Sequence, residues 1–184
     1  MVKIETPRLL LRPIEESDAQ DIYEYSCNPN VGITAGWKPH ESIEETKEIM
    51  EQIFIRQKNI FGIVLKESNK LIGTIGLIQD PRRENPKAKM IGYALAQEEW
   101  GKGLMTEATK AVISYGFNEE SLELISCTCY PDNQRSNRVI EKCGFHYEGC
   151  FRQCEVRYDG TLMDMKSFSI TLQEWNKQNS NKKD

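Results

Sequence analysis

Two glycines and a lysine stand together where an apolar segment meets a run of helical character. In the stretch QEEWGKGLMTEA, Gly101, Lys102 and Gly103 precede residues whose apolar side chains recur at helical spacing. The first turn of a helix carries unpaired N–H groups and a partial positive charge, so it attracts anions. Glycines let the backbone approach an anion closely, and the lysine adds a cation. The stretch therefore predicts a phosphate or pyrophosphate site, with a glycine-rich turn that serves packing alone as the alternative.

This stretch does not match the two best-known phosphate loops. A P-loop needs the pattern GxxxxGK[ST], whereas Lys102 lies between the two glycines. A dinucleotide fingerprint needs a third Gly or Ala, and this chain has Thr106 at that position. The stretch alone therefore does not choose among phosphate-bearing ligands.

A second strand end followed by a short helix comes about 30 residues later, in PDNQRSNRVIEKCGF. Two helix N-termini that face one crevice at the carboxyl ends of strands form a common ligand position in α/β sheets. Asp132, Asn133 and Ser136 also favour helix starts, so ordinary capping is the alternative interpretation.

The hydrophobic pattern places both stretches within one sheet and its covering helices. Strands are predicted at 8–14, 60–66, 71–79, 90–96, 122–130, 145–158 and 161–170. Helices are predicted at 17–25, 43–54, 104–115 and 136–143. The resulting order is strand, two helices, three strands, helix, strand, helix, two strands. This order predicts a mixed α/β sheet covered by helices.

Turn and cap signals set the boundaries of these elements. Asn28, Pro29, Asn30 and Gly32 are expected to end the first helix, and Ser42 opens a capping box with Glu45. The dipeptide Asp159-Gly160 predicts a hairpin turn. The polar tail at 176–184 is expected to fray. Since no linker or repeat divides the chain, we expect a single domain over 1–184, with its core at about 4–172.

Composition excludes several classes of protein. With 39% hydrophobic and 28% charged residues, the chain has the composition of a soluble globular protein. Its 24 Lys and Arg against 28 Asp and Glu give a net charge of -4, which argues against nucleic acid as a partner. No apolar run is long enough for a signal peptide or a membrane span, so we expect a cytoplasmic protein with no membrane partner. The six cysteines are expected to be reduced and mostly buried.

Taken together, the two stretches resemble a known family. WGKGLMTEA followed by NQRSNRVIEKCGF resembles the GCN5-related N-acetyltransferase (GNAT) superfamily, and more closely its Rim-type branch of RimJ/RimL-like ribosomal-protein N-terminal acetyltransferases. TPRLLLRPIEESDA and GFHYEGCFRQCE resemble the same branch, so the likeness runs from residue 4 to about 172. It implies the GNAT acyl-CoA N-acyltransferase fold with the element order given above. It further implies acetyl-CoA as co-substrate, bound where the fourth and fifth strands splay apart, and no metal.

The resemblance also implies roles for individual residues. The pyrophosphate would be held by backbone groups of Trp100, Gly101, Lys102, Gly103, Leu104, Met105 and Thr106. Leu95 would offer backbone groups to the pantetheine arm and thioester, Asn133 would bond the pantetheine, and Asn137 and Arg138 would lie close to the cofactor. The superfamily often has Gln or Arg where this chain has Glu98, whose charge is unfavourable near pyrophosphate unless the side chain points to water.

The implied reaction is direct acetyl transfer from a thioester to a neutral amine. An α-amino group, with a pKa near 7.7 to 8.0, is neutral far more often at pH 7 than lysine, with a pKa near 10.4. Many superfamily members protonate the departing thiolate with a tyrosine, but this chain has Ile140 there, so the Rim-type serine, Ser136, takes that role by resemblance. The general base by resemblance is Glu155, with or without an intervening water, and a surface glutamate is the alternative.

Other reactive residues have weaker claims. Cys129 corresponds to a Rim-type cysteine near the thioester, although core packing explains it as well. Cys143 and His146 could form an acyl-enzyme pair, or a zinc site with Cys127 and Cys129, but their directions are expected to diverge at a helix end. In the loop before the capped helix, His40 is expected at the surface, and Trp37 either lines an acceptor pocket or packs in the core.

We therefore predict an acetyl-CoA-dependent N-acetyltransferase that acts on a primary amine, most readily a peptide or protein N-terminus. One alternative acceptor is a small amine such as a polyamine, an amino acid or an amine drug. An alternative of another class is a non-catalytic acyl-CoA-binding or sensor module. The acceptor is expected between the first two helices and the last hairpin, and the sequence leaves open its identity and whether the chain forms a homodimer.

Overall fold

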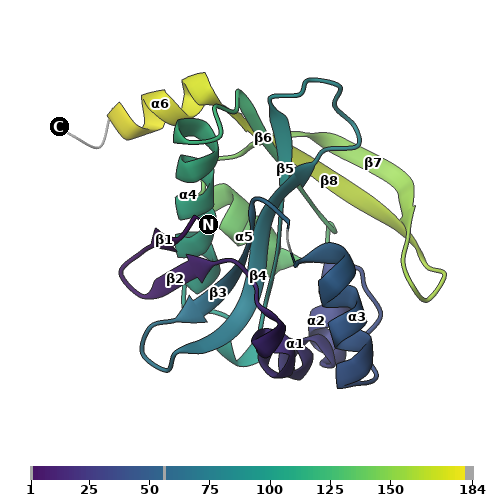
Figure 1. Cartoon of the computed structure of the whole chain (residues 1–184). Helices are drawn as coiled ribbons and strands as arrows, with labels where there is room; N and C mark the ends of the chain where they lie inside the picture. Colours follow the sequence, from purple (N-terminus) through teal and green to yellow (C-terminus); the bar gives the residue numbers. More distant parts are fainter. Residues whose placement is uncertain (1, 56, 181–184) are drawn as a thin grey trace.

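The computed structural model describes residues 2–55 and 57–180, and its centre is one eight-stranded mixed sheet (Figure 1). The strand order is β1-β2-β3-β4-β5-β6-β8-β7, and all neighbours are antiparallel except β5 and β6. The strands are β1 (Ile4–Glu5), β2 (Leu9–Arg12), β3 (Ile60–Leu65), β4 (Lys70–Gln79), β5 (Ala88–Leu95), β6 (Leu124–Cys129), β7 (His146–Val156) and β8 (Leu162–Thr171).

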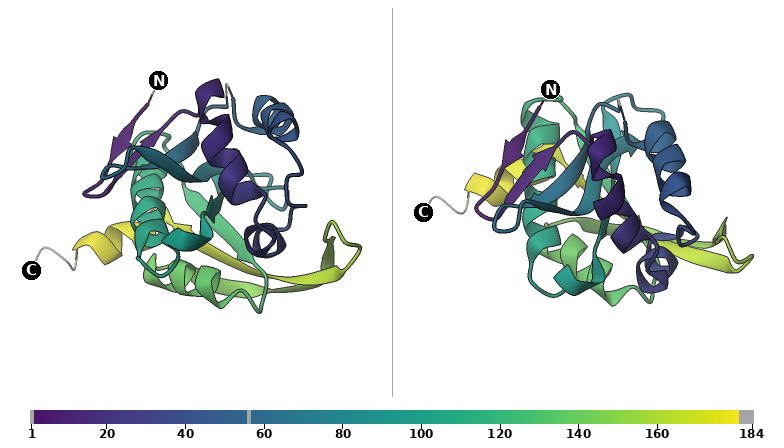
Figure 2. Two further views of the ribbon diagram at one scale, coloured as in Figure 1. Left: turned by 90° about the horizontal axis from the view of Figure 1, so that it is seen from below. Right: turned by 60° about the horizontal axis from the view of Figure 1, so that its bottom comes forward.

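Helices cover both faces of this sheet, as Figure 2 shows from below. On one face lie α1 (Ala19–Ser26), α2 (Pro29–Ala35) and α3 (Ile43–Ile53). On the other lie α4 (Leu104–Asn118) and α5 (Gln134–Lys142), with α6 (Leu172–Ser180) near the far end of α4. Two 3-10 turns, η1 (Glu16–Asp18) and η2 (Gln97–Glu99), precede α1 and the glycine-rich loop.

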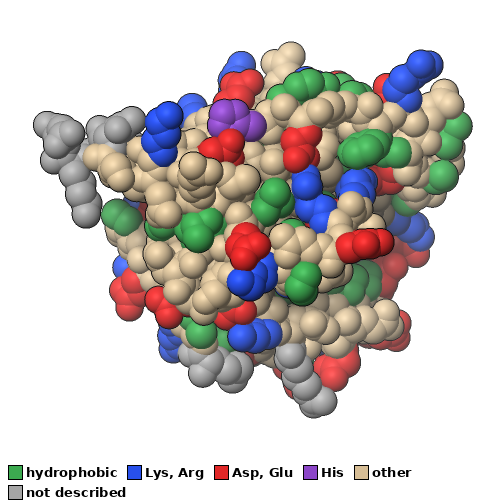
Figure 3. All heavy atoms as spheres, turned by 90° about the horizontal axis from the view of Figure 1, so that it is seen from above, with side chains coloured by type: hydrophobic (Ala, Val, Ile, Leu, Met, Phe, Trp, Pro, Cys, Tyr) green, Lys and Arg blue, Asp and Glu red, His purple; other side chains and the backbone are tan. Residues whose placement is uncertain are grey.

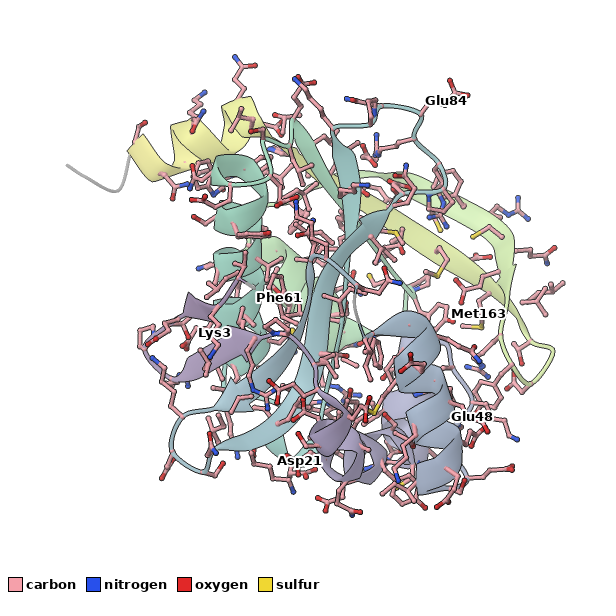
Figure 4. All side chains as sticks on the ribbon, viewed as in Figure 1. Lys3, Asp21, Glu48, Phe61, Glu84 and Met163 are labelled. Atoms are coloured by element: carbon pink, nitrogen blue, oxygen red, sulfur yellow. The ribbon has the colours of Figure 1, made fainter. Side chains whose placement is uncertain are left out.

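Because both faces are covered, the core forms two apolar clusters with the sheet between them. The larger cluster packs α4 against the sheet, and Figure 4 labels Phe61 at this position. The Phe61 ring meets Tyr115 of α4 edge-on, with 5.6 Å between centroids. The smaller cluster includes Ile22 of α1 and Met50 of α3. Central strand β4 is buried on both faces, and its seven consecutive buried residues explain why it lacks a simple alternating pattern.

The predicted α/β class and mixed sheet are confirmed, but the predicted element order misses β1, α2 and α6. The helix predicted at 17–25 ends at Ser26, as expected. The residues expected to stop it also begin α2, because Asn28 Oδ1 accepts the Asn30 N–H at 2.9 Å and Pro29 occupies the first helical position. Three helices therefore precede β3 instead of two.

Two further boundary predictions are partly corrected. Ser42 Oγ accepts the Glu45 N–H at 3.1 Å, as a capping box requires, but the Glu45 carboxylate bonds the Glu41 N–H instead of that of Ser42. The polar stretch from 176 belongs to α6 as far as Ser180, and 181–184 lie outside the described residues. The Trp175 and Phe117 ring centroids lie 5.4 Å apart, and Gln178 Nε2 donates to the Gly144 carbonyl at 3.0 Å, so α6 is held against the rest of the molecule.

Charged side chains of both signs are interspersed on the face seen from above (Figure 3). This mixture agrees with the near balance of 24 basic and 28 acidic residues. Within the described part of the chain, no helix has the length and apolar character needed to cross a membrane.

Candidate active site

A gap opens in the sheet where its two parallel strands separate. β5 and β6 pair only from Ala88 with Leu124 to Met90 with Ser126. Beyond these three residue pairs the carboxyl ends of both strands diverge, as the predicted splay requires. A cavity of about 420 Å³ fills the gap, and most residues singled out from the sequence line it. These are Leu95, Trp100, Gly101, Gly103, Leu104, Met105, Thr106, Asn133, Ser136, Arg138 and Glu155.

The glycine-rich loop needs its glycines for backbone conformation. Gly101 has φ +78° and Gly103 φ +79°, which is the left-handed region that other residues enter only with strain. A Cβ at Gly101 would meet no atom within 4 Å, so steric crowding inside the protein does not explain this glycine. Gly103 is the N-cap of α4 and supplies no side-chain cap, which leaves the first-turn N–H groups available beside the cavity. The loop therefore fits an anionic group of a ligand.

Arg8 ties this loop to the N-terminal strands. Its Nη1 donates to the Lys102 carbonyl at 2.9 Å, and its Nε donates to Glu107 Oε2 at 2.7 Å. Burial opposes ionisation of Glu107, but hydrogen bonds from Thr6 and Arg8 outweigh it and lower the pKa of Glu107. The carboxylate in the first turn of α4 is thus paired within the protein. Arg8 was not predicted from the sequence as part of the site.

Trp100 connects the loop to the opposite wall of the cavity. Its Nε1 donates to the Leu95 carbonyl at 2.9 Å, which leaves that carbonyl one further lone pair. The guanidinium of Arg135 lies 3.9 Å from the centre of the Trp100 ring, in a cation–π contact between α5 and the loop. Arg135 lines the cavity and was not predicted from the sequence.

Two charged residues of the loop point elsewhere. Lys102 Nζ pairs with Glu99 Oε2 at 3.0 Å, and Lys102 does not line the cavity. Glu98 is exposed in η2 and does not line it either, so its charge does not oppose an anion there. The cations that do line the cavity come from α5 and are Arg135, Arg138 and Lys142.

Ser136 lies where β5 and α5 face each other across the gap. Its Oγ is 2.8 Å from the Tyr93 hydroxyl, and its N–H is accepted by Asn133 Oδ1 at 3.1 Å. Burial raises the pKa of Tyr93 well above its ordinary value and that of Cys129 to about 11, so both stay neutral at pH 7. Tyr93 was not predicted as a site residue, because a tyrosine in a strand is most simply explained by packing.

The two asparagines of the α5 start differ in position. Asn133 lines the cavity, and its Nδ2 donates to the Thr34 carbonyl of α2 at 3.2 Å. Asn137 does not line it, because its Nδ2 donates to the Asn133 carbonyl at 2.8 Å and its Oδ1 accepts from Lys166 at 3.3 Å. Asn133 therefore combines ordinary capping with a position at the cavity wall.

Glu155 lines the cavity near α2 and accepts a hydrogen bond from the Tyr130 hydroxyl. Glu155 follows a bulge in β7, where the register with β8 shifts between Phe151 and Glu155, and this bulge sets the direction of the Glu155 side chain. Gln153 in this bulge has φ +49°, and its N–H donates to Asp164 at 2.8 Å. Burial and the contact with Glu155 raise the pKa of Tyr130, so its proton stays available for that bond.

The structure does not support the acyl-enzyme pair of Cys143 and His146. Cys143 is buried with its Sγ 3.8 Å from the Thr106 carbonyl, whereas His146 is exposed and 3.5 Å from Glu174 Oε1. These different surroundings give no support to an acyl-enzyme pair. Among the described residues, no group of three or more His, Cys, Asp and Glu could hold a metal ion.

Several expectations about single residues need correction. His40 is buried, not at the surface, and its Nδ1 lies 2.9 Å from Thr46 Oγ1. Of the two interpretations left open for Trp37, the structure supports packing, because the side chain lies against the smaller core cluster and does not line the cavity. Three of the six cysteines are buried and two are exposed, so "mostly buried" describes only half of them, and all six are free thiols.

Comparison with known proteins agrees with this geometry. Residues 8–146 match the family model of the acetyltransferase (GNAT) domain. The uncharacterized N-acetyltransferase YoaA of Bacillus subtilis is 35% identical over 174 residues, which are 91% of this chain and 95% of the relative. The [ribosomal protein uS5]-alanine N-acetyltransferase of Escherichia coli is 26% identical, covering 95% of this chain and 93% of the relative.

Solved structures share the fold. A GNAT-family acetyltransferase from Bacillus anthracis superposes with a TM-score of 0.81 at 27% identity, covering 92% of this chain and 98% of the other. The spermidine N-acetyltransferase of Vibrio cholerae, solved with CoA and spermine, has a TM-score of 0.78 at 23% identity, covering 93% and 99%. Family model, relatives and cavity thus agree, and this chain belongs to the GNAT family of N-acetyltransferases.

Proposed function

We propose that this enzyme acetylates the α-amino group of a peptide or protein N-terminus, as a Rim-type member of its family, with acetyl-CoA as donor. The observation that carries this proposal is one continuous cavity. It begins at the loop of Gly101 and Gly103, passes Ser136, and reaches Glu155 beside α2. An anion receptor, a hydroxyl and a carboxylate thus lie along one ligand path, in the order that a CoA thioester and an incoming amine require.

The donor would lie with its diphosphate at the N-terminus of α4 and its thioester beside Ser136. The free N–H groups after Gly103 would hold the diphosphate, and the second lone pair of the Leu95 carbonyl could accept an amide N–H of the pantetheine arm. As the tetrahedral intermediate collapses, the sulfur takes the electron pair of the C–S bond and needs a proton. Ser136 Oγ, in contact with the Tyr93 hydroxyl, supplies or relays that proton.

Glu155 would take the proton that the amine nitrogen loses on forming the new C–N bond. Its carboxylate lines the end of the cavity next to Tyr130 and Gly36. A Cβ at Gly36 would come within 2.7 Å of the Tyr130 hydroxyl, so the end of α2 packs directly on this pair. An α-amino group suits this base because a large fraction is already neutral near pH 7.5.

The charges around the acceptor end favour a monoamine over a polyamine. A second hollow of about 300 Å³ adjoins the cavity and shares Thr34, Tyr130, Asn133 and Arg135 with it. The charged residues that line the second hollow are Asp132, Arg135 and Arg157, and Arg157 pairs with Asp159 at 2.6 Å. With Glu155, three acids then stand against two cations, which is little negative charge for a multiply charged amine.

The wall around this acceptor end is formed by the β7–β8 hairpin and by α2. Figure 4 labels Met163 of β8, which lines the second hollow. The [ribosomal protein uS5]-alanine N-acetyltransferase of Escherichia coli is similar over 95% of this chain, which also supports a protein or peptide acceptor.

An acceptor panel tests the proposal. The enzyme is incubated with acetyl-CoA and peptides that begin with Ala, Ser, Met or Gly, next to spermidine, free amino acids and N-acetylated control peptides, and free thiol is measured. We expect turnover with unblocked peptides and none with blocked ones. Turnover confined to spermidine or small amines would refute the peptide acceptor, and CoA binding without any turnover would indicate a binding module.

A further inference from the structure

Three cations form a stripe along one face of α5. Arg135, Arg138 and Lys142 follow the spacing i, i+3, i+7 and all line the main cavity. Seven residues of helix span about 10 Å, so the stripe extends well past the width of one phosphate group. Such a row is notable in a chain with a net charge of -4.

The first of these cations already has a partner. Arg135 lies on the Trp100 ring, at the end of α5 that carries Ser136. For Arg138 and Lys142, the described residues include no carboxylate in ion-pair contact and no side-chain hydrogen bond. Cations that line a cavity without a counter-charge are suited to bind an anion from solution.

The position of this pair along the cavity identifies which anion. Cys143, next to Lys142, contacts the Thr106 carbonyl, so this end of α5 packs beside the first turn of α4. Ser136 and Glu155 lie toward the opposite end. With the diphosphate at the α4 N-terminus and the thioester at Ser136, the adenosine half of the ligand must extend toward Arg138 and Lys142. Its ribose carries the only further phosphate of CoA, on the 3′-oxygen.

We propose that Arg138 and Lys142 bind the ribose 3′-phosphate and make this enzyme select CoA over its 3′-dephospho form. This inference rests on the proposed position of the donor and concerns only its binding, not the acceptor. The 3′-phosphate carries close to two negative charges at neutral pH, and a guanidinium and an ammonium match it in charge. The backbone donors after Gly103 serve the diphosphate and do not distinguish the two ligands.

Calorimetry with two ligands tests the proposal. CoA and 3′-dephospho-CoA are titrated into the wild-type protein and into the double variant Arg138→Ala, Lys142→Ala. We expect the wild type to bind CoA about tenfold or more tightly than 3′-dephospho-CoA, and the double variant to lose most of that preference. Affinity for 3′-dephospho-CoA should change less than about threefold between the two proteins. The wild-type preference should also shrink as salt is raised.

A matched control removes two positive charges elsewhere. Lys47 on α3 and Lys87 before β5 are exposed and do not line the cavity, so Lys47→Ala, Lys87→Ala should keep the full preference. Equal weakening of both ligands by the α5 variant would overturn the proposal, because the two cations would then serve the diphosphate or the fold. An unchanged preference would overturn it too. Failure of the peptide panel would leave these affinities measurable, so the two proposals can fail separately.

Discussion

Replacement of Gly103 by alanine tests whether the loop needs glycine for its backbone conformation, because there is enough space for the added Cβ. A Cβ at this position would meet only Arg8 Nη2, at 3.6 Å, which is an ordinary contact. The backbone angles, φ +79° and ψ 3°, are left-handed, and an L-residue pays about 1–2 kcal/mol to adopt them. Since the loop is exposed, the free variant is expected to relax out of this conformation.

A relaxed loop must return to the left-handed conformation when it binds the diphosphate. The strain then appears in the affinity, as a Kd for CoA raised about 5- to 30-fold. Gly103→Asn should show a smaller loss, because asparagine enters the left-handed region more readily. The expected change in the free energy of unfolding is below about 1 kcal/mol, since alanine also restricts the unfolded chain.

Gly160, in the β7–β8 turn, provides the matched control. It has φ +83°, and a Cβ there would meet no atom within 4 Å. Gly160→Ala therefore introduces similar strain away from the cavity and should leave the Kd for CoA unchanged. Calorimetry and thermal unfolding of both variants check the reasoning. Wild-type affinity in Gly103→Ala would refute the role of this loop conformation in anion binding.

Three further predictions concern other residues. Ser136→Ala should slow thiol release, spare CoA affinity and cost about 1 kcal/mol of stability, because the half-buried Tyr93 hydroxyl loses its partner. Adding Tyr93→Phe should restore most of that stability but not turnover, and undiminished turnover in either variant would remove Ser136 from the mechanism. Glu155→Gln should lower kcat/KM by about 10²–10⁴ at unchanged CoA affinity; normal rates would exclude it as the base. Burial lowers the pKa of His40, so its contribution to stability is complete above about pH 6.5 and is lost as the pH falls below it. His40→Asn should reduce the loss of stability measured by denaturant unfolding between pH 7 and 5.5, and an identical pH dependence would contradict this assignment.

The sequence predicts the sheet and the loop well because their signals are local. Glycines at 101 and 103 before a helical pattern predict a turn into a helix and an anion site there without knowledge of distant residues, and the structure has the turn and the helix. The prediction fails where one residue serves two elements. Asn28 and Pro29 end one helix and begin the next, and reading them as a stop hides α2. α6 is missed because its polar sequence is held by distant partners, such as Phe117 against Trp175 and the Gly144 carbonyl, which accepts from Gln178 Nε2 at 3.0 Å.

Long-range partners account for what the sequence left out of the site. Arg8 reaches the loop from 94 positions away, and Tyr93 reaches Ser136 from 43 positions away. Nothing in a local pattern indicates such pairs. Lys102 illustrates the reverse case, because its place between two glycines suggests a phosphate contact whereas its ammonium pairs with Glu99. Side-chain direction on an exposed loop is set by neighbours that spacing does not reveal.

Only three residue pairs join β5 to β6, so the sheet consists of two halves with a short connection. Beyond these pairs, backbone groups of Ile91–Leu95 and Cys127–Cys129 have no neighbouring strand across the gap. An extended ligand that carries amide groups can form hydrogen bonds with both strand ends, as an added strand would. In the position proposed above, the donor would therefore complete the sheet while it is bound. Amide hydrogen exchange at these two strand ends should slow when CoA is present and recover when it leaves.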